Sequence, residues 1–231
     1  MIQRTARSDV RVLIIEDHAL FSESLELALS IEGYDVRRIP LPAARGSSNH
    51  LLSSATRLRP RIALLDLDLG PLGDGVRLIT PLVQAGIHVV VVTGSIDKAR
   101  WGESLRYGAR TVLAKTQPLN DILATVRRIN QGLPVMDRVE REQLIQLWRD
   151  QREKLQVLVD RLQLLTPREQ VVLGQLMKGH QVREIAHQSV VSEATVRTQV
   201  KSILAKLEVS SQLGAVGLAH EIGWRPLAVA G

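Results

Sequence analysis

Ionisable and hydroxyl side chains follow the short apolar runs in the first half of the chain. Glu16 and Asp17 come after the first run, and later runs are followed by Asp66, Thr93 and Lys115. Clustered carboxylates repel one another unless a cation lies among them, and an all-oxygen ligand set suits Mg²⁺. Such an ion would neutralise charge on a phosphoryl group in transfer, while a lysine pairs with the phosphoryl oxygens. These residue types predict phosphoryl chemistry, provided that the fold brings them together.

The elements that must position these residues are five apolar runs, which alternate with stretches of helical periodicity. Continuous runs rich in β-branched residues are typical of parallel strands covered on both faces, so we expect a doubly wound α/β domain of five βα units. Ligands of such folds bind beyond the carboxyl ends of the strands, where the polar residues would lie. The expected strands are VRVLII (10–15), YDVRRI (34–39), RIALL (61–65), HVVVV (88–92) and RTVLA (110–114).

The stretch ALLDLDLG (63–70) could serve two different chemistries. In a haloacid-dehalogenase-like phosphatase, Asp66 would be a nucleophile and Asp68 a general acid, whereas in a receiver domain one Asp carries a reversible phosphoryl mark. Both families place a Thr or Ser and then a Lys after the Asp. The phosphatase also needs an acidic metal-binding motif downstream of Lys115, but here the extra acids lie upstream, after the first strand.

With this order of acids, VLIIEDH, LLDLDLG, VVVTGS and VLAK resemble the motifs of a response-regulator receiver domain, and the resemblance covers residues 1–133. It implies a (βα)5 fold with the strand order 2-1-3-4-5. By this resemblance Asp66 is the phosphoacceptor, Thr93 is the hydroxyl that turns toward the phosphoryl group, and Lys115 is its counter-charge. The implied Mg²⁺ ligands are Glu16, Asp17, Asp66 and the backbone carbonyl of Asp68.

Residues 166–231 carry helix signals in close succession. The segment TPRE at its start is a capping box with Pro at the first helical position, and Gly179 ends that helix. After a second short helix, Ser192 opens a longer one that runs to about Leu207, which is the helix-turn-helix plan. LTPRE, EIA, VSEATVRTQVKSILAKL and AVGLA resemble the LuxR-type domain of the NarL/FixJ regulators. The resemblance implies an all-α domain of four helices that binds DNA.

The longer helix would then be the recognition helix, with charged and polar residues on its exposed face. Arg and Lys can bind guanine, and hydroxyl and ammonium groups can bind phosphates. The alternative is an exposed charged face that serves solubility alone. The positions that resemble the family's base and groove contacts are Arg197, Thr198 and Lys201, and those that look more like phosphate contacts are Thr195 and Lys206.

Both domains contain departures from the family patterns. An aromatic residue usually precedes the receiver lysine by three positions and rotates inward on activation, but this chain has Val112. Because valine cannot make that rotation, the route by which the signal leaves the site stays open. In the second domain, Ser189-Val190 fills the turn where Leu-Gly is usual, so this turn must accept an unusual residue or a different bend.

Residues 134–165 are expected to form a linker helix. Apolar residues recur there at alternating spacings of four and three, as in an a/d seam. One interpretation is a parallel coiled coil that pairs two subunits, with the polar Gln151 fixing the register. The other is an amphipathic helix that lies on its own domain. The seam positions are Leu144, Trp148, Gln151, Leu155, Leu158, Leu162 and Leu165.

Composition limits the remaining classes. The 231 residues include no cysteine, which excludes disulfides and thiolate metal sites. The net charge of +6 is spread along the chain, and with 3% aromatic residues a base-stacking platform is not expected. The polar start MIQRTARS and the lack of a long apolar run predict a cytoplasmic protein without membrane contact.

Together these features predict a two-component response regulator that is not an enzyme. A sensor histidine kinase would phosphorylate Asp66 with Mg²⁺ bound, and the added charge would bias a homodimer toward double-stranded DNA and transcriptional control. One alternative is a constitutively dimeric DNA-binding regulator that does not depend on phosphorylation. A less favoured one is the haloacid-dehalogenase-like phosphatase.

Overall fold

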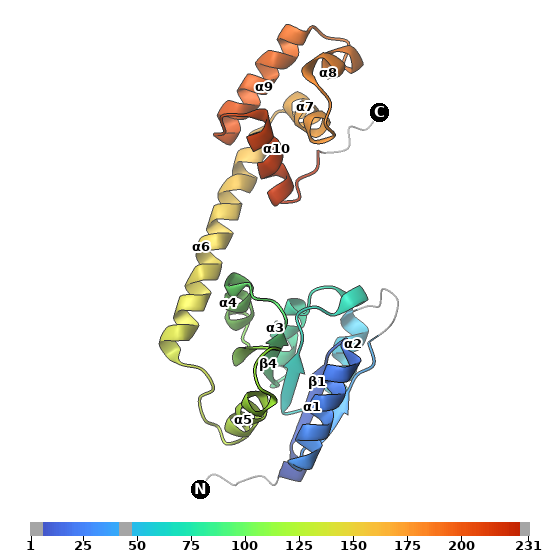
Figure 1. Ribbon diagram of the computed structural model, residues 1–231, viewed down its shortest axis with the longest axis vertical. Helices are drawn as coiled ribbons and strands as arrows, with labels where there is room; N and C mark the ends of the chain where they lie inside the picture. Colours follow the sequence, from blue (N-terminus) through green and yellow to red (C-terminus); the bar gives the residue numbers. More distant parts are fainter. Residues whose placement is uncertain (1–6, 42–47, 227–231) are drawn as a thin grey trace. The chain divides into compact units, whose positions relative to one another are not determined.

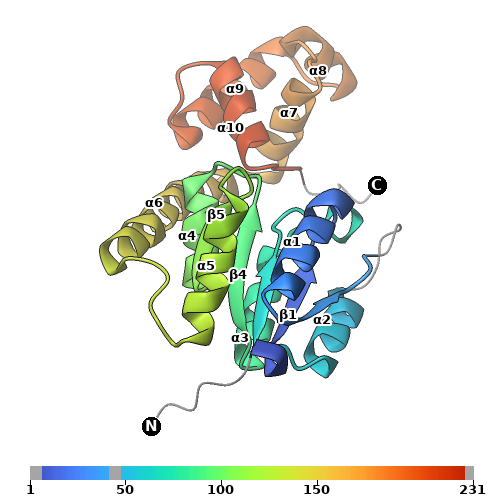
Figure 2. The same ribbon diagram turned by 60° about the horizontal axis from the view of Figure 1, so that its bottom comes forward.

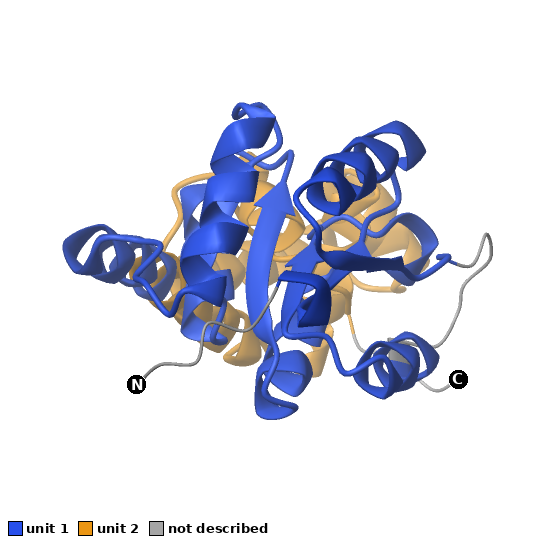
Figure 3. Ribbon diagram, turned by 90° about the horizontal axis from the view of Figure 1, so that it is seen from below, with its two compact units in different colours: residues 1–149 blue, residues 150–231 orange. Residues whose placement is uncertain are grey.

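The computed structural model describes residues 7–41 and 48–226, which divide into two compact units. The first unit comprises residues 1–149 and the second residues 150–231 (Figure 3). The segment 134–165, expected as a separate linker, is thus shared between the two units. Among the described residues, no helix is both long enough and apolar enough to span a bilayer.

The first unit is built on a five-stranded parallel sheet with the order β2-β1-β3-β4-β5, as predicted. Val12 in β1 pairs with Val36 of β2 on one side and with Ile62 of β3 on the other. The strands are short and almost fully buried in the middle of the sheet because helices cover both faces. They are β1 (Arg11–Ile15), β2 (Asp35–Arg38), β3 (Ile62–Leu65), β4 (His88–Thr93) and β5 (Thr111–Ala114).

Five helices alternate with these strands and form the two outer layers. Helices α1 and α5 lie on one face of the sheet (Figure 2). They pack against it through side chains such as Leu25, Leu29 and Val126. The other face packs against α2, α3 and α4, through Leu51, Ile79 and Leu105 among others. The helices are α1 (Ala19–Ile31), α2 (Ser48–Arg57), α3 (Val76–Gln84), α4 (Lys98–Arg106) and α5 (Leu119–Asn130). Two short 3-10 turns lie at Arg7–Asp9 and Gly70–Leu72.

Helix α6 (Arg138–Gln163) follows the receiver-like fold and contributes to both units (Figure 1). Near its start, Leu144 joins the core on the α4 side of the sheet. Near its end, Leu162 joins the core of the second unit together with Leu165 just beyond the helix. The amphipathic pattern of this segment is therefore used for packing within the chain at both ends.

The second unit contains four further helices, as predicted for the region after residue 166. They are α7 (Pro167–Met177), α8 (Val182–Gln188), α9 (Glu193–Leu207) and α10 (Gln212–Glu221). Thr166 and Glu169 form the predicted capping box of α7, and Ser192 caps α9 by accepting a hydrogen bond from the amide of Thr195. Helices α7, α8 and α9 meet in one apolar core around Leu173, Ile185 and Ile203, to which α10 contributes.

Candidate functional site

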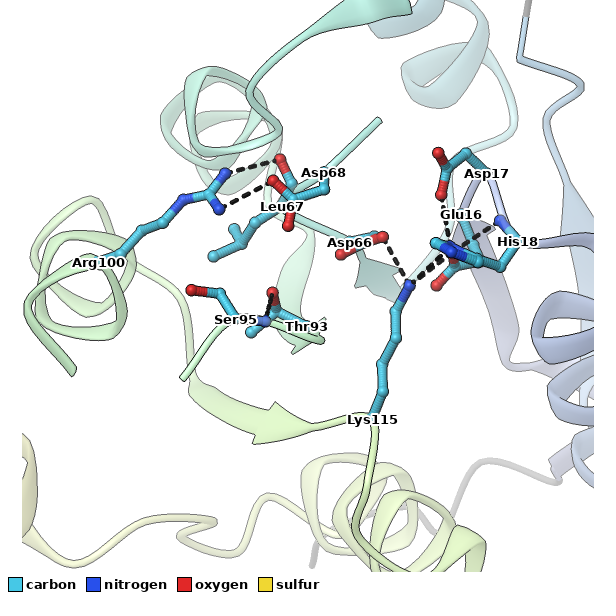
Figure 4. Close-up of polar contacts among 10 residues, drawn as sticks. All are labelled: Glu16, Asp17, His18, Asp66, Leu67, Asp68, Thr93, Ser95, Arg100 and Lys115. Atoms are coloured by element: carbon cyan, nitrogen blue, oxygen red, sulfur yellow. Dashed lines mark hydrogen bonds and ion pairs between the residues drawn. The ribbon is translucent and has the colours of Figure 1, made fainter. Parts of the chain in front are cut away.

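The carboxylates predicted to bind a cation lie together at the carboxyl ends of β1 and β3 (Figure 4). Ligand atoms of Glu16, Asp17, His18 and Asp66 all lie within 4.8 Å of one another. Parallel strands bring their carboxyl ends to one edge of the sheet, which explains why residues 50 positions apart in the sequence meet here. The carboxylate oxygens suit a hard divalent cation such as Mg²⁺.

Lys115 reaches these carboxylates from the end of β5. Its Nζ lies 2.7 Å from Oδ2 of Asp66 and 2.8 Å from Oε1 of Glu16. Burial alone would lower the pKa of Lys115, but its hydrogen bonds to Asp66 and Glu16 outweigh burial and raise it. Burial dominates for Glu16 and raises the pKa of that carboxyl. The ammonium thus compensates the charge of two carboxylates whose side chains are almost completely buried.

Asp66 is almost completely buried, at 2% relative exposure. Its Oδ2 binds Lys115, whereas Oδ1 is buried and has no hydrogen-bond partner among the described residues. A buried carboxylate oxygen without a partner is rare and costly unless a ligand completes it. A metal ion or a phosphoryl group would provide that completion, so the residues present fit Mg²⁺ and phosphoryl chemistry.

The loop after Asp66 is held closely by backbone packing. A Cβ atom at Gly75 would lie 2.2 Å from the backbone carbonyl oxygen of Asp66, so only glycine fits there. The same loop brings Asp68 into a bridge with Asp74. This packing fixes the segment that would offer the Asp68 carbonyl to a cation.

Thr93 ends β4 and is fully buried. Its Oγ1 accepts a hydrogen bond from the backbone amide of Ser95 at 3.1 Å, which engages the hydroxyl with its own loop (Figure 4). A rotation of the Thr93 side chain that carries the hydroxyl toward a phosphoryl group on Asp66 would break this bond.

Arg100 in α4 is a site residue that sequence reasoning missed. Its guanidinium donates to Asp68 Oδ1 at 2.9 Å, to Asp74 Oδ1 at 3.0 Å and to the carbonyl of Leu67 at 3.1 Å. Burial alone would lower the pKa of Arg100, but the hydrogen bonds to Asp68 and Asp74 raise it instead. Arg100 therefore ties the first turn of α4 to the loop that follows the phosphoacceptor candidate. No motif marks it, because its partners are brought near only by the fold.

The predicted recognition helix is α9, whose candidate base contacts are exposed. Arg197, Thr198 and Lys201 all point away from the core that Val196 and Val200 join. Arg197 donates to Glu193 one turn earlier, at 3.1 Å, and both side chains are solvent-accessible. Thr195, predicted to contact phosphate, is also exposed and lies 2.9 Å from the hydroxyl of Ser192.

Lys206 lies in a different environment from the other predicted contacts. Its Nζ is 2.6 Å from Oε2 of Glu169, a buried carboxylate that also accepts from Ser202 and from the amide of Thr166. Burial alone would raise the pKa of Glu169, but these hydrogen bonds lower it to about 2. Lys206 thus compensates a buried charge inside its own domain, and a phosphate contact would require it to leave that charge.

The seam positions of α6 are not equivalent. Three of them, Leu144, Leu162 and Leu165, are buried in the two cores. The middle of the helix is more open: Gln151 is exposed, and Trp148, Leu155 and Leu158 are partly buried. This packing matches the second interpretation, a helix on its own domain, at both ends of the seam. A coiled coil over the full seam would require these ends to leave their cores.

Two known families match this chain. Residues 12–127 match the response regulator receiver domain, and residues 163–219 match the bacterial regulatory proteins of the luxR family. Response regulator protein VraR of Staphylococcus epidermidis is 29% identical over 214 residues, which cover 92% of this chain and 97% of that protein. VraR of Staphylococcus aureus is 28% identical over the same shares.

The chain is also similar to the solved structure of RcsB from Salmonella enterica serovar Typhimurium, which was determined bound to promoter rprA with the phosphomimetic BeF3⁻. That structure is 21% identical, with a TM-score of 0.48 over 90% of this chain and 97% of RcsB. The receiver match alone spans half of the sequence. The chain therefore belongs to the response regulators of two-component systems and joins a receiver domain to a LuxR-type DNA-binding domain.

Proposed function

We propose that this protein is a switch in which phosphorylation of Asp66 controls DNA binding and transcription. The observation that carries the proposal is the buried Asp66 carboxylate, with Oδ2 held by Lys115 and Oδ1 without a partner among the described residues. A nucleophilic carboxylate needs one oxygen free for attack and a nearby cation for the charge that develops. The receiver match favours this switch over a phosphatase.

In the proposed reaction, a carboxylate oxygen of Asp66 attacks the phosphorus of a phosphohistidine on a sensor kinase. The N–P bond breaks as the O–P bond forms, and the histidine nitrogen retains the electron pair. Glu16, Asp17 and Asp66 would hold Mg²⁺ together with the Asp68 carbonyl, and the ion would supply positive charge opposite the phosphoryl oxygens. Lys115 would move from the Asp66 carboxylate to a phosphoryl oxygen.

The output of the switch would be DNA binding by α9. Arg197 and Lys201 lie one turn apart and Thr198 is adjacent, so all three can face one groove. A homodimer would present two such helices to paired half-sites on double-stranded DNA. The open middle of α6, from Gln151 to Leu158, and the second domain are the surfaces that we propose for pairing.

The experiment that tests this function begins with selection of a binding site from a pool of random duplexes. Binding to that site is then titrated, with light scattering in parallel, in the presence and absence of beryllofluoride and Mg²⁺. We expect tighter binding and a larger dimer fraction with beryllofluoride, and no response from Asp66→Ala. Equal binding in both states, by a dimer, would favour the constitutive regulator instead.

A further inference from the structure

The first half of α6 rests on α4 at very short range. At Gly102, in the middle of α4, an added Cβ would lie 1.9 Å from the backbone carbonyl oxygen of Leu144 and 3.1 Å from Cβ of Trp148. The two helices therefore touch backbone to backbone, and any side chain at position 102 would force them apart. Leu144 itself is 7% exposed and packs in the same core as Leu105 of α4.

Arg141 adds polar contacts to this packing. Its guanidinium donates to the carbonyl of Leu105 at 2.7 Å and to the carbonyl of Ala109 at 2.9 Å. The Leu105 carbonyl lies in the last turn of α4, where it also accepts from the amide of Gly108 and where the helix dipole attracts a cation. The rings of Tyr107 and Trp148 meet edge to face, with their centroids 6.3 Å apart.

The start of α4 is connected to the candidate phosphorylation site. The indole Nε1 of Trp101 donates to the carbonyl of Ser95 at 2.9 Å, and the amide of Ser95 donates to Oγ1 of Thr93 at 3.1 Å. Ser95 thus links the indole of Trp101 to the hydroxyl of Thr93 through two hydrogen bonds. Arg100 ties the same turn of α4 to the loop after Asp66.

Trp101 is partly buried and packs against the apolar core on the α4 side of the sheet. The next residue, Gly102, makes the close contact with Leu144 of α6. A displacement of Trp101 would therefore also displace the residue on which α6 packs. Coupling between distant sites requires an element with two states.

We propose that the first half of α6 is a latch on α4 that opens when Thr93 turns toward a phosphoryl group, with Trp101 transmitting the change in place of an aromatic at position 112. The inference rests on the proposed function. When the Thr93 side chain rotates and its hydroxyl donates to the phosphoryl group, the Ser95 amide loses its acceptor and the loop shifts. Trp101 moves together with the Ser95 carbonyl to which it donates. The contact between Gly102 and Leu144 is too close to accommodate this movement, so α6 separates from α4.

Hydrogen exchange of the full-length protein tests the latch, read by mass spectrometry over peptides that cover residues 138–149. Addition of beryllofluoride and Mg²⁺ should speed exchange there about tenfold, because the equilibrium constant for local opening rises by the same factor. Trp101→Phe keeps an aromatic ring but loses the N–H donor, so it should still bind beryllofluoride while the response of residues 138–149 shrinks. A full response in Trp101→Phe would contradict the role of the indole.

Two variants open the latch without any phosphoryl mimic. Gly102→Ala and Arg141→Gln should each speed exchange over residues 138–149 in the resting protein. The matched controls are Gly217→Ala, where an added Cβ meets no atom within 4 Å, and Arg138→Gln, whose side chain is 89% exposed. Unchanged exchange in both test variants, with circular dichroism as for the wild type, would show that there is no latch.

The outcomes separate the latch from the proposed function. Protection of the peptides around Asp66 reports whether beryllofluoride binds at all. A wild-type protein that shows no such protection contradicts phosphorylation at Asp66. One that shows protection at Asp66 but no change over residues 138–149 contradicts the latch alone.

Discussion

Nζ of Lys115 lies 2.7 Å from Oδ2 of Asp66, and both side chains are largely withdrawn from water. The same ammonium lies 2.8 Å from Oε1 of Glu16, so one cation compensates two buried carboxylates that follow different strands. Removing a partner from a buried ion pair leaves an uncompensated charge. The resting stability of the receiver domain thus depends on a residue that we also assign to phosphoryl binding.

Lys115→Ala should lower the free energy of unfolding of the receiver domain by about 3 kcal/mol in the presence of a chelator. Mg²⁺ should stabilise this variant more than it stabilises the wild type, because the ion no longer competes with the ammonium. Thermal unfolding with EDTA and with Mg²⁺ measures both effects. Arg106→Ala removes an exposed cation from α4 and serves as the control. An equal effect of Mg²⁺ on variant and wild type would argue against an ion at Asp66.

Glu169→Gln should lower the free energy of unfolding of the second domain by about 2 kcal/mol at neutral pH, since charge-assisted hydrogen bonds are lost. The pKa of Glu169 is lowered to about 2, below that of an unfolded glutamate. Its contribution is therefore complete above the ordinary glutamate range and is lost as the pH falls toward 2. The free energy of unfolding, measured with denaturant from neutral pH down toward pH 2, should depend less on pH for Glu169→Gln than for the wild type. Glu193→Gln, at an exposed pair, should keep the wild-type profile.

Val190→Gly should stabilise the second domain by about 1 kcal/mol. Val190 has φ of +54° in the turn between α8 and α9, a left-handed conformation that is costly for a β-branched residue. It is also 92% exposed, so the substitution removes little packing. The neighbouring Val191→Gly relieves no such strain and should destabilise the domain. A loss of stability in Val190→Gly, measured by denaturant unfolding, would contradict this account of the turn.

Arg197→Ala and Lys201→Ala should each weaken binding to a selected DNA site by about 1–3 kcal/mol, while the domain stays folded. Arg197→Ala should also relax the preference at one base pair, because a base contact carries sequence information. Lys206→Ala should act mainly on stability, since its ammonium lies on Glu169. Fluorescence anisotropy with matched and mismatched duplexes separates these effects.

The fold and the centre of the site follow from short-range patterns in the sequence. Apolar runs predicted the strands, and parallel strands necessarily bring Glu16, Asp66 and Lys115 to one edge. The helix-turn-helix was equally visible, because its caps at Thr166 and Ser192 are local signals. The sequence also marked the turn at Val190 as unusual, and the structure shows the reason in its positive φ.

Contacts between distant positions could not be predicted in the same way. Arg100 and Asp68 are 32 positions apart, and Lys206 and Glu169 are 37 apart, on elements whose mutual packing no pattern specifies. The heptad spacing of α6 predicted an apolar face but not its partner, since the same face suits another helix or the core of its own domain. At the start of α6, Gly102 determines the partner, because it allows a backbone contact between α4 and α6 that no other residue permits.

The most direct test of the account is the mass of the intact protein after incubation with a small-molecule phosphodonor. We predict one added phosphoryl group in the presence of Mg²⁺, none with EDTA, and none for Asp66→Asn under either condition. Peptide mapping should place the group on Asp66, and it should be lost in alkali, as an acyl phosphate is. Full labelling of Asp66→Asn, or labelling that is the same with EDTA, would contradict phosphorylation of Asp66 at a magnesium site.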